Sequence, residues 1–263
     1  MKQNVIALDG LSYVGKSTIA QSLAKLTGYS YINTGHMYRA VAKLALERGI
    51  PAGNVEVLSA MTRGMEIHFE NSPVQPRTIV NGQDWTTAMD DDRTVRFAPQ
   101  IAALPAIRDI LTEQQRTMAQ KTTIIMEGRD IGTVVFPQAK WKFFVSASFE
   151  IRARRMYKRL PPELKAKISL TDPAFLDKLR LLDESDLNRP VAPLRKAEDA
   201  IEYDNSTSPT EMEDALILYY CLHHPDAVEN HFIPYGLETL RAAQSCYEKK
   251  ERQSMRGKHC GTA

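Results

Sequence analysis

Short apolar runs alternate along this chain with longer segments in which apolar positions recur every three or four residues. The short runs are typical of buried parallel strands, and the longer segments predict amphipathic helices. Their alternation predicts an α/β fold, a parallel sheet with helices on both faces. The expected strands are Val5–Leu8, Tyr29–Ile32, Thr123–Met126, Lys142–Ser146 and Ala200–Tyr203. The expected helices are Lys16–Thr27, Met37–Arg48, Arg93–Ala119, Phe149–Leu160, Pro173–Leu182 and Thr210–Leu222.

Two regions interrupt this alternation. Met65–Asp84 contains two short apolar runs and an Asn81-Gly82 turn signal, which together predict a small β insertion. Residues 152–189 are rich in arginine and lysine, and we expect them to form a mobile, helical, cationic lid. The long helix at Arg93–Ala119 is expected to break near Pro99 and Pro105, because proline removes a helical hydrogen bond.

The tail after Leu222 differs in composition from the rest of the chain. It contains two further prolines and a charged stretch, and a helix is expected over Leu237–Gln253. Roughly the last ten residues are expected to be disordered, as chain ends often are.

Composition narrows the class of protein. The 263 residues suffice for one α/β domain with an insertion or for two small domains. A net charge of +2 gives no reason to expect nucleic acid or an anionic membrane as a partner. The three cysteines form no CxxC pair, which favours a reducing compartment. The chain has no run of about 18 apolar residues, and its first strand starts too early for a signal peptide. We therefore expect a cytoplasmic protein.

The residues from Gly10 to Ser17 read Gly-Leu-Ser-Tyr-Val-Gly-Lys-Ser, a Walker A phosphate-binding loop between a predicted strand and a predicted helix. Backbone N–H groups of such a loop surround phosphate oxygens at the positive end of the helix. Lys16 is expected to reach the β- and γ-phosphates of ATP, and the Ser17 hydroxyl to ligate Mg²⁺. The expected ATP-binding residues are Gly10, Leu11, Ser12, Tyr13, Val14, Gly15, Lys16, Ser17 and Thr18.

Two further motifs follow predicted strands. Asn33–Arg39 places Arg39 at the carboxyl end of the second strand, where a second phosphate can bind, although a helix cap followed by a surface arginine explains the pattern equally well. Glu127–Thr133 follows the third strand. Glu127 can hold the water shell of Mg²⁺, and Arg129 and Asp130 offer a phosphate clamp beside a base acceptor. A salt bridge within a tight turn is the alternative.

Two cationic segments complete the candidate chemistry. Arg152, Arg155 and Arg159 share one helical face and would neutralise charge on a transferring phosphoryl group if a triphosphate lies nearby. A solvated face is the alternative. The segment 186–200 can return Asp186 and Arg189 to the site, or form a proline-rich surface loop.

Together these motifs resemble the cytidylate kinase family, the bacterial CMP/dCMP kinases among P-loop nucleoside monophosphate kinases. The resemblance extends from about Val5 to Leu222, and its most specific segments are Thr34–Arg39, Gly128–Pro137 and 192–200. It implies a P-loop NTPase fold with a five-stranded parallel sheet. It also implies a kinase domain over 1–222, with a nucleotide-binding insertion at about 63–92 and a lid at about 150–185, and an extension over 223–263.

The resemblance implies transfer of a phosphoryl group from ATP to CMP or dCMP with Mg²⁺. Separately, we expect a monomer without nucleic-acid or membrane partners. Arg39, Arg129 and Arg189 would clamp the monophosphate, Arg108 and Asp130 would read cytosine, and Asp186 would bind the ribose. The full set of expected substrate-binding residues is Thr34, Tyr38, Arg39, Arg108, Arg129, Asp130, Asp186 and Arg189. The expected catalytic residues are Lys16, Arg129, Arg155 and Arg159. The expected metal-binding residues are Ser17 and, through water, Glu127.

Four residues depart from the family pattern. Tyr13 replaces a small residue, Asn33 an aspartate, Pro99 a serine near the base and Leu182 an arginine near the sugar. Because the phosphate clamps are retained, the departures favour a weaker or broader enzyme over an inactive one. A kinase of mixed UMP/CMP specificity and a catalytically weak nucleotide-binding regulator remain the alternatives.

Overall fold

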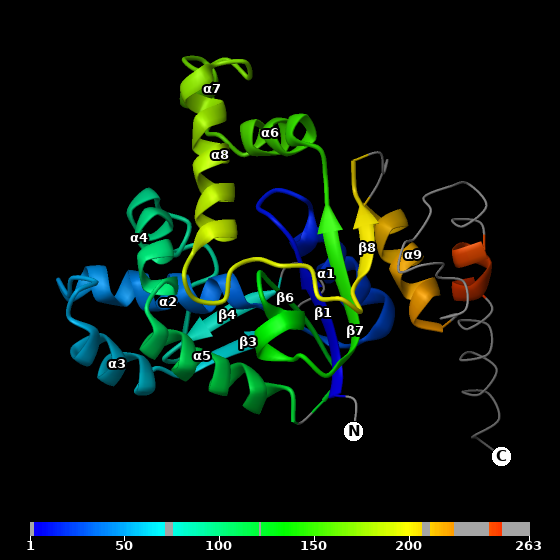
Figure 1. Cartoon of the computed structure of the whole chain (residues 1–263), viewed down its shortest axis with the longest axis horizontal. Helices are drawn as coiled ribbons and strands as arrows, with labels where there is room; N and C mark the ends of the chain where they lie inside the picture. Colours follow the sequence, from blue (N-terminus) through cyan, green and yellow to red (C-terminus); the bar gives the residue numbers. More distant parts are fainter. Residues whose placement is uncertain (1–2, 72–75, 121, 207–210, 224–241, 249–263) are drawn as a thin grey trace.

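The computed structural model describes residues 3–71, 76–120, 122–206, 211–223 and 242–248. Its centre is a five-stranded sheet in the order β2-β6-β1-β7-β8, and every neighbouring pair of strands is parallel (Figure 1). The predicted α/β fold class is therefore confirmed. The strands are β1 (Gln3–Asp9), β2 (Ser30–Asn33), β6 (Ile124–Gly128), β7 (Ala139–Ser146) and β8 (Ile201–Asp204).

Alternate residues of β1 supply the two cores that flank the sheet, because successive strand side chains point to opposite faces. Ile6 and Leu8 pack with α1 (Lys16–Thr27) and α9 (Glu211–His223) on one face. Val5 and Ala7 pack on the other face with the short π-helical segment Ile131–Val135. All four side chains are nearly inaccessible to solvent, so the sheet is covered on both faces.

The predicted β insertion is present as an antiparallel sheet of three strands, β3 (Ile67–Glu70), β4 (Arg77–Val80) and β5 (Gln83–Asp84). It shares a core with α2 (Thr34–Glu47) and α3 (Val55–Arg63). The sequence did not predict α3, although Asn54 caps its first turn by accepting from Val57 N at 3.4 Å.

The long helix expected over Arg93–Ala119 is two helices, α4 (Asp92–Ala102) and α5 (Pro105–Met118). The break near Pro105 is confirmed, since this proline begins α5, where its missing N–H costs nothing. The break near Pro99 is wrong, because α4 continues through this residue. Pro99 lies on the exposed side of α4, where water can bond the carbonyl that it leaves unpaired.

The lid segment is helical, as expected, and is built from α6 (Phe149–Lys158), α7 (Pro162–Lys165) and α8 (Pro173–Asn188). Figure 1 shows α6 and α8 above the carboxyl ends of the central strands. Met156 and Phe175 anchor a separate small core between α6 and α8. The helix expected to end at Leu182 runs on to Asn188, which brings Asp186 onto its last turn.

The tail after α9 is described only at residues 242–248, which are helical and fall within the expected Leu237–Gln253 helix. The rest of that helix and the segment expected to be disordered lie outside the described residues. Ala243 is fully buried. Cys246 and Tyr247 pack against the core that α1 and α9 share, and the Tyr247 ring meets Tyr219 edge-on at 5.6 Å between centroids. No helix among the described residues is long and apolar enough to cross a membrane.

Candidate functional site

The loop after β1 has the backbone of a phosphate-binding loop, and two of its glycines cannot be replaced without a clash. Gly10 has φ +151°, and an added Cβ would lie 2.1 Å from the carbonyl oxygen of Val145. Gly15 has φ +98°, and its Cβ would lie 2.4 Å from Asn205 Nδ2. Asn205 itself donates to Val14 O at 2.8 Å, so β8 and its following residue support the loop from behind.

Lys16 is the first residue of α1 and its ammonium lies inside the loop. Nζ donates to Gly10 O at 2.8 Å and to Leu11 O at 2.6 Å. Burial, with a smaller contribution from Arg129, lowers the pKa of Lys16 to about 7. An arriving phosphate would favour the charged form of this side chain. The lysine is therefore positioned for phosphate and poorly stabilised as a cation until phosphate arrives.

Glu127 joins the loop to β2 and β6. Its carboxylate accepts from Ser17 Oγ at 3.0 Å and from the Tyr31 hydroxyl, while its carbonyl accepts from Thr34 Oγ1 at 2.7 Å. A hydroxyl and a carboxylate are the oxygen donors that Mg²⁺ prefers, commonly with water completing the coordination. Ser17 and Glu127 therefore fit the expected magnesium role, although no group of three or more acidic or His/Cys ligands occurs among the described residues.

Asp130 lies between two arginines at the end of β6. It forms a buried ion pair with Arg108 of α5, and its second oxygen lies 3.4 Å from Arg189 Nη2. The Arg108 guanidinium also lies 5.5 Å from the centroid of the Tyr38 ring. Arg189 Nη2 is buried and has no hydrogen-bond partner among the described residues. The Asp130 carboxylate therefore lies beside an Arg189 N–H donor whose hydrogen-bonding capacity is not filled by the described residues.

Arg129 points the other way from Asp130. Its Nε donates to Asp186 at 2.6 Å, and its Nη2 donates to Ser12 Oγ at 2.8 Å. The salt bridge within a tight turn that we considered is absent, because Arg129 and Asp130 each pair with a residue distant in sequence. Arg129 thus links the phosphate-binding loop to the last turn of the lid helix α8.

Arg39 and His36 both belong to α2, and both are half-buried. Arg39 Nη1 pairs with Asp90 at 2.6 Å, with about a third of the arginine side chain exposed. His36 is bonded through Nδ1 to Thr78 Oγ1 at 2.8 Å, which ties α2 to β4. Burial lowers the pKa of His36. His36 therefore connects α2 to β4.

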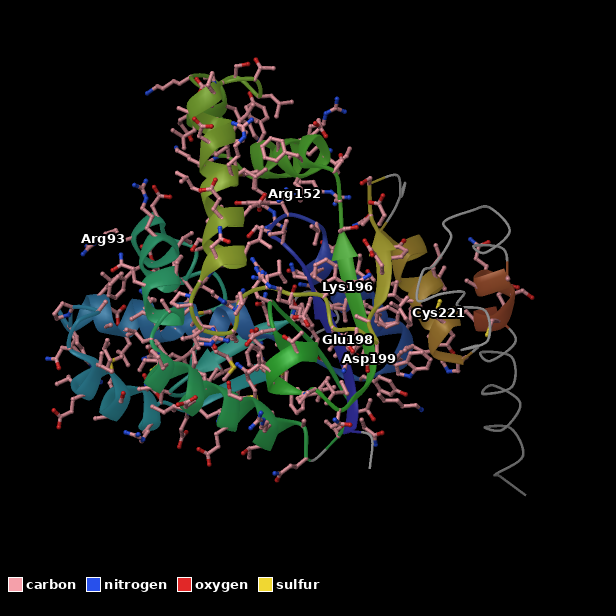
Figure 2. All side chains as sticks on the ribbon, viewed as in Figure 1. Arg93, Arg152, Lys196, Glu198, Asp199 and Cys221 are labelled. Atoms are coloured by element: carbon pink, nitrogen blue, oxygen red, sulfur yellow. The ribbon has the colours of Figure 1, made fainter. Side chains whose placement is uncertain are left out.

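The three lid arginines that share a helical face all meet the phosphate-binding loop. Arg155 donates to Val14 O at 3.0 Å, and Arg152 approaches Ser12 O at 3.5 Å. The Arg159 guanidinium lies 5.6 Å from the centroid of the Tyr13 ring. Arg152 also forms two 2.7 Å bonds with Asp183, and Figure 2 shows it below α6 and beside α8. Arg152 is buried and Arg155 is half-buried against the loop, whereas Arg159 is exposed.

These groups surround one cavity of about 310 Å³ at the carboxyl ends of the central strands. Of the expected residues outside the phosphate-binding loop, Arg108 and Arg155 do not line it, because Arg108 lies behind Asp130 and Arg155 bonds the loop carbonyls. The expected ATP-binding residues that do not line it are Gly10, Leu11, Val14, Gly15 and Thr18. The departures Tyr13, Asn33, Pro99 and Leu182 all line the cavity. The expected residues that line it are Ser12, Tyr13, Lys16, Ser17, Thr34, Tyr38, Arg39, Glu127, Arg129, Asp130, Arg159, Asp186 and Arg189.

Comparison with known proteins decides the family. The cytidylate kinase family model matches residues 6–218. A cytidylate kinase of Pseudomonas fluorescens is 40% identical over 78% of this chain and 90% of its own length. One of Clostridium perfringens is 42% identical over 76% and 89%. The chain belongs to the cytidylate kinase family. A nucleotide kinase family implies ATP as the phosphoryl donor.

One solved structure adds little to this family assignment. TT1252 of Thermus thermophilus aligns with a TM-score of 0.39 at 18% identity, over 83% of this chain and 96% of that chain. This likeness is too weak to support an argument.

Sequence reasoning missed several residues that support the cytidylate kinase site. Asp9 is buried at the end of β1 and accepts from the N–H groups of Ile131 and Gly132, at 2.9 and 2.7 Å. Burial raises its pKa to about 6. The sequence feature that could have identified Asp9 is its position directly before Gly10, the first residue of the phosphate-binding loop. Asn205, Asp183 and Asp90 gave no comparable signal, because each acts on a residue far away in the sequence.

No residue of the segment 192–200 lines the cavity. Asp199 bonds Lys142 Nζ with both carboxylate oxygens, at 2.7 and 2.9 Å. Figure 2 labels it beside β7, below the carboxyl ends of the strands. This part of the family motif therefore fastens β7 to the loop before β8.

Proposed function

We propose that this protein transfers the γ-phosphoryl group of ATP to CMP or dCMP, forming ADP and CDP or dCDP. The observation that carries the proposal is the placement of Asp130, which lines the same cavity as Lys16 and Ser17. A carboxylate accepts hydrogen bonds only, so it can pair with the exocyclic amine of cytosine. In uracil a carbonyl oxygen replaces this amine and would meet the carboxylate oxygen without a proton between them.

Two arginines support this role for Asp130. The ion pair with Arg108 fixes one carboxylate oxygen from behind, and Arg189 approaches the other. The buried Arg189 Nη2, unbonded in the described part of the chain, offers a donor to the acceptor phosphate. Base recognition and phosphate binding would therefore meet in the corner formed by β6, α5 and α8.

The chemistry requires mainly positioning and charge stabilisation. An oxygen of the CMP phosphate attacks the γ-phosphorus while the bond to the bridging oxygen of ADP breaks. The acceptor is already a dianion near neutral pH, which fits a site whose His36 is used structurally. Lys16 would bind the β- and γ-phosphates, and Arg129 and Arg159 would contact the transferring group.

Asp186 would bind the sugar while Arg129 holds it at 2.6 Å. Thr34, Tyr38 and Arg39 would complete the acceptor wall, since all three line the cavity. Arg155 would support the phosphate-binding loop, because it bonds the carbonyl oxygens of Val14 and Asn205. When bound, Mg²⁺ would neutralise charge on the triphosphate, with Ser17 as its direct ligand and Glu127 acting through water.

The test is direct detection of product. Purified full-length protein with ATP, Mg²⁺ and CMP should convert the CMP signal into the two phosphorus resonances of CDP in ³¹P NMR. Addition of excess EDTA should stop the conversion. Absence of CDP under these conditions would contradict phosphoryl transfer to CMP and would favour the regulator alternative. Equal conversion of UMP would favour mixed UMP/CMP specificity.

A further inference from the structure

The lid arginine Arg159 differs from its two neighbours in what holds it. Arg152 is fixed by the Asp183 carboxylate, and Arg155 by backbone carbonyls of the loop. Among the described residues, the Arg159 guanidinium has no hydrogen bond or ion pair. The contact that defines its place is the ring of Tyr13, 5.6 Å from centroid to guanidinium carbon.

Tyr13 is itself held firmly, in an unusual backbone conformation. Its φ is +62°, a left-handed value that side chains rarely adopt. Its ring packs against the small core of the lid, which includes Met156 and Phe175. Its carbonyl accepts from Arg155 at 3.4 Å. The loop thus presents an aromatic face to the lid from a fixed position.

Both partners line the cavity, so their contact lies at the site and not on a distant surface. An aromatic face attracts a guanidinium without neutralising its charge. A carboxylate in the same place would hold Arg159 more strongly, but it would compete with the phosphate for that charge. An aromatic partner therefore suits a cation that must be positioned in advance and still carry its full charge to a phosphoryl group.

We propose that Tyr13 is a positioning residue that holds Arg159 over the phosphoryl group in transit. The proposal rests on the proposed function, because Arg159 needs a transferring group to act on. It assigns a role to a residue that departs from the family pattern. Tyr13 would act through its side chain, whereas the phosphate-binding loop otherwise acts through its backbone N–H groups. Tyr13 acts through Arg159, so its effect should disappear when Arg159 is absent.

The test compares Tyr13→Phe with Tyr13→Leu. Phenylalanine keeps the aromatic face, whereas leucine keeps apolar packing against Met156 and Phe175 but loses the attraction to Arg159. We expect Tyr13→Leu to lower kcat about five- to tenfold with little change in KM for CMP. Tyr13→Phe should stay within about twofold of the unsubstituted protein.

Two further variants separate positioning from general packing. In an Arg159→Met background, Tyr13→Leu should cause no additional loss of kcat, since the cation that it positions is gone. Phe149→Leu is the matched control, because Phe149 contacts Arg152 and Arg180 at 5.7 and 5.1 Å outside the cavity lining. It should leave kcat unchanged. Tyr13→Met replaces Tyr13→Leu if thermal melts show that the leucine variant does not fold.

Equal kcat for Tyr13→Leu and the unsubstituted protein would overturn the proposal. The same loss in the presence and absence of Arg159 would overturn it as well, as would an equal loss in Tyr13→Phe. Failure of the proposed function is a separate result: the unsubstituted protein would then form no CDP at all.

Discussion

The two halves of the cavity hold their cations in different ways. On the side of the phosphate-binding loop, the cavity is lined by Lys16, which bonds neutral carbonyl oxygens, and by Arg159, which faces an aromatic ring. Arg152 and Arg155 lie outside the cavity lining, where Arg152 pairs with Asp183 and Arg155 bonds loop carbonyls. On the acceptor side the arginines meet carboxylates. The acceptor-side pairs are Arg39 with Asp90, Arg108 and Arg189 with Asp130, and Arg129 with Asp186.

This difference suits the loop side to binding the charge of a triphosphate, and the acceptor side to recognising the shape of a nucleotide. Carbonyl oxygens are weaker partners than phosphate oxygens for a cation, because a phosphate adds the attraction of its full negative charge to the hydrogen bond. A triphosphate can therefore take over Lys16 and Arg159. Arginines paired with carboxylates keep fixed orientations and less net charge, so the acceptor side can select a nucleotide by geometry.

On the side of the phosphate-binding loop, we expect the substitution of Lys16 to cause the largest loss of activity. We expect Lys16→Ala to lower kcat by about 10²–10³-fold or more, because it removes a fixed cation from the site of charge transfer. Its thermal unfolding should change little, since the lysine is a poorly stabilised buried cation. The measurement is ADP release alongside a melting curve. Lys25→Ala, an exposed change on the same helix, is the control, and near-normal turnover in Lys16→Ala would contradict the assignment.

Asp130→Asn tests the acceptor side. An amide loses the charge and mismatches the cytosine edge, so the ratio of kcat/KM for CMP over UMP should fall by about 5–150-fold. The variant should also melt earlier, since Arg108 and Arg189 lose their shared buried partner, at a cost of about 3–5 kcal/mol. The ratio is independent of the folded fraction. Asp109→Asn, an exposed neighbour of Arg108, is the control, and an unchanged ratio in Asp130→Asn would exclude base reading.

A smaller expected effect is the uptake of a proton by Lys16 when ATP binds, which depends on pH. The pKa of Lys16 is lowered to about 7 from 10.5. Between these values the unfolded chain holds more protons, so the contribution of Lys16 to stability rises with pH across this window. Binding of ATP should reverse the shift and take up about one proton at most near pH 8. Calorimetry in buffers of different ionisation enthalpy measures this uptake. Lys16→Met should abolish it, and equal uptake by both proteins would contradict the assignment of the proton to Lys16.

The sequence predicted the elements whose signals are local. The strand Val5–Leu8, the loop at Gly10–Ser17 and the helix Lys16–Thr27 follow from apolar patterning and glycine placement, and the structure contains all three. The Pro99 break was wrong because the rule against proline inside a helix ignores exposure. The helix α3 is short, and its cap alone was too weak a signal.

For the candidate site too, residues with a local sequence signal were predicted and their distant partners were not. Motif residues at strand ends, such as Glu127 and Asp130, line the cavity as their spacing indicated. The partners that hold them come from distant segments: Tyr31 is 96 residues from Glu127, and Asp186 is 57 from Arg129. No periodicity or spacing rule relates such positions. Only folding places them together, and this is why the pairing pattern that separates the two halves emerged from the structure.

The central claim is that a carboxylate on a fixed acceptor wall selects cytosine nucleotides for phosphoryl transfer from ATP. The most direct measurement is kcat/KM by coupled ADP release with CMP, dCMP, UMP and AMP under one set of conditions. We expect CMP and dCMP to be used, and UMP and AMP to be at least about tenfold poorer. Equal use of UMP, or no acceptor-dependent ADP release with any of the four, would contradict the account.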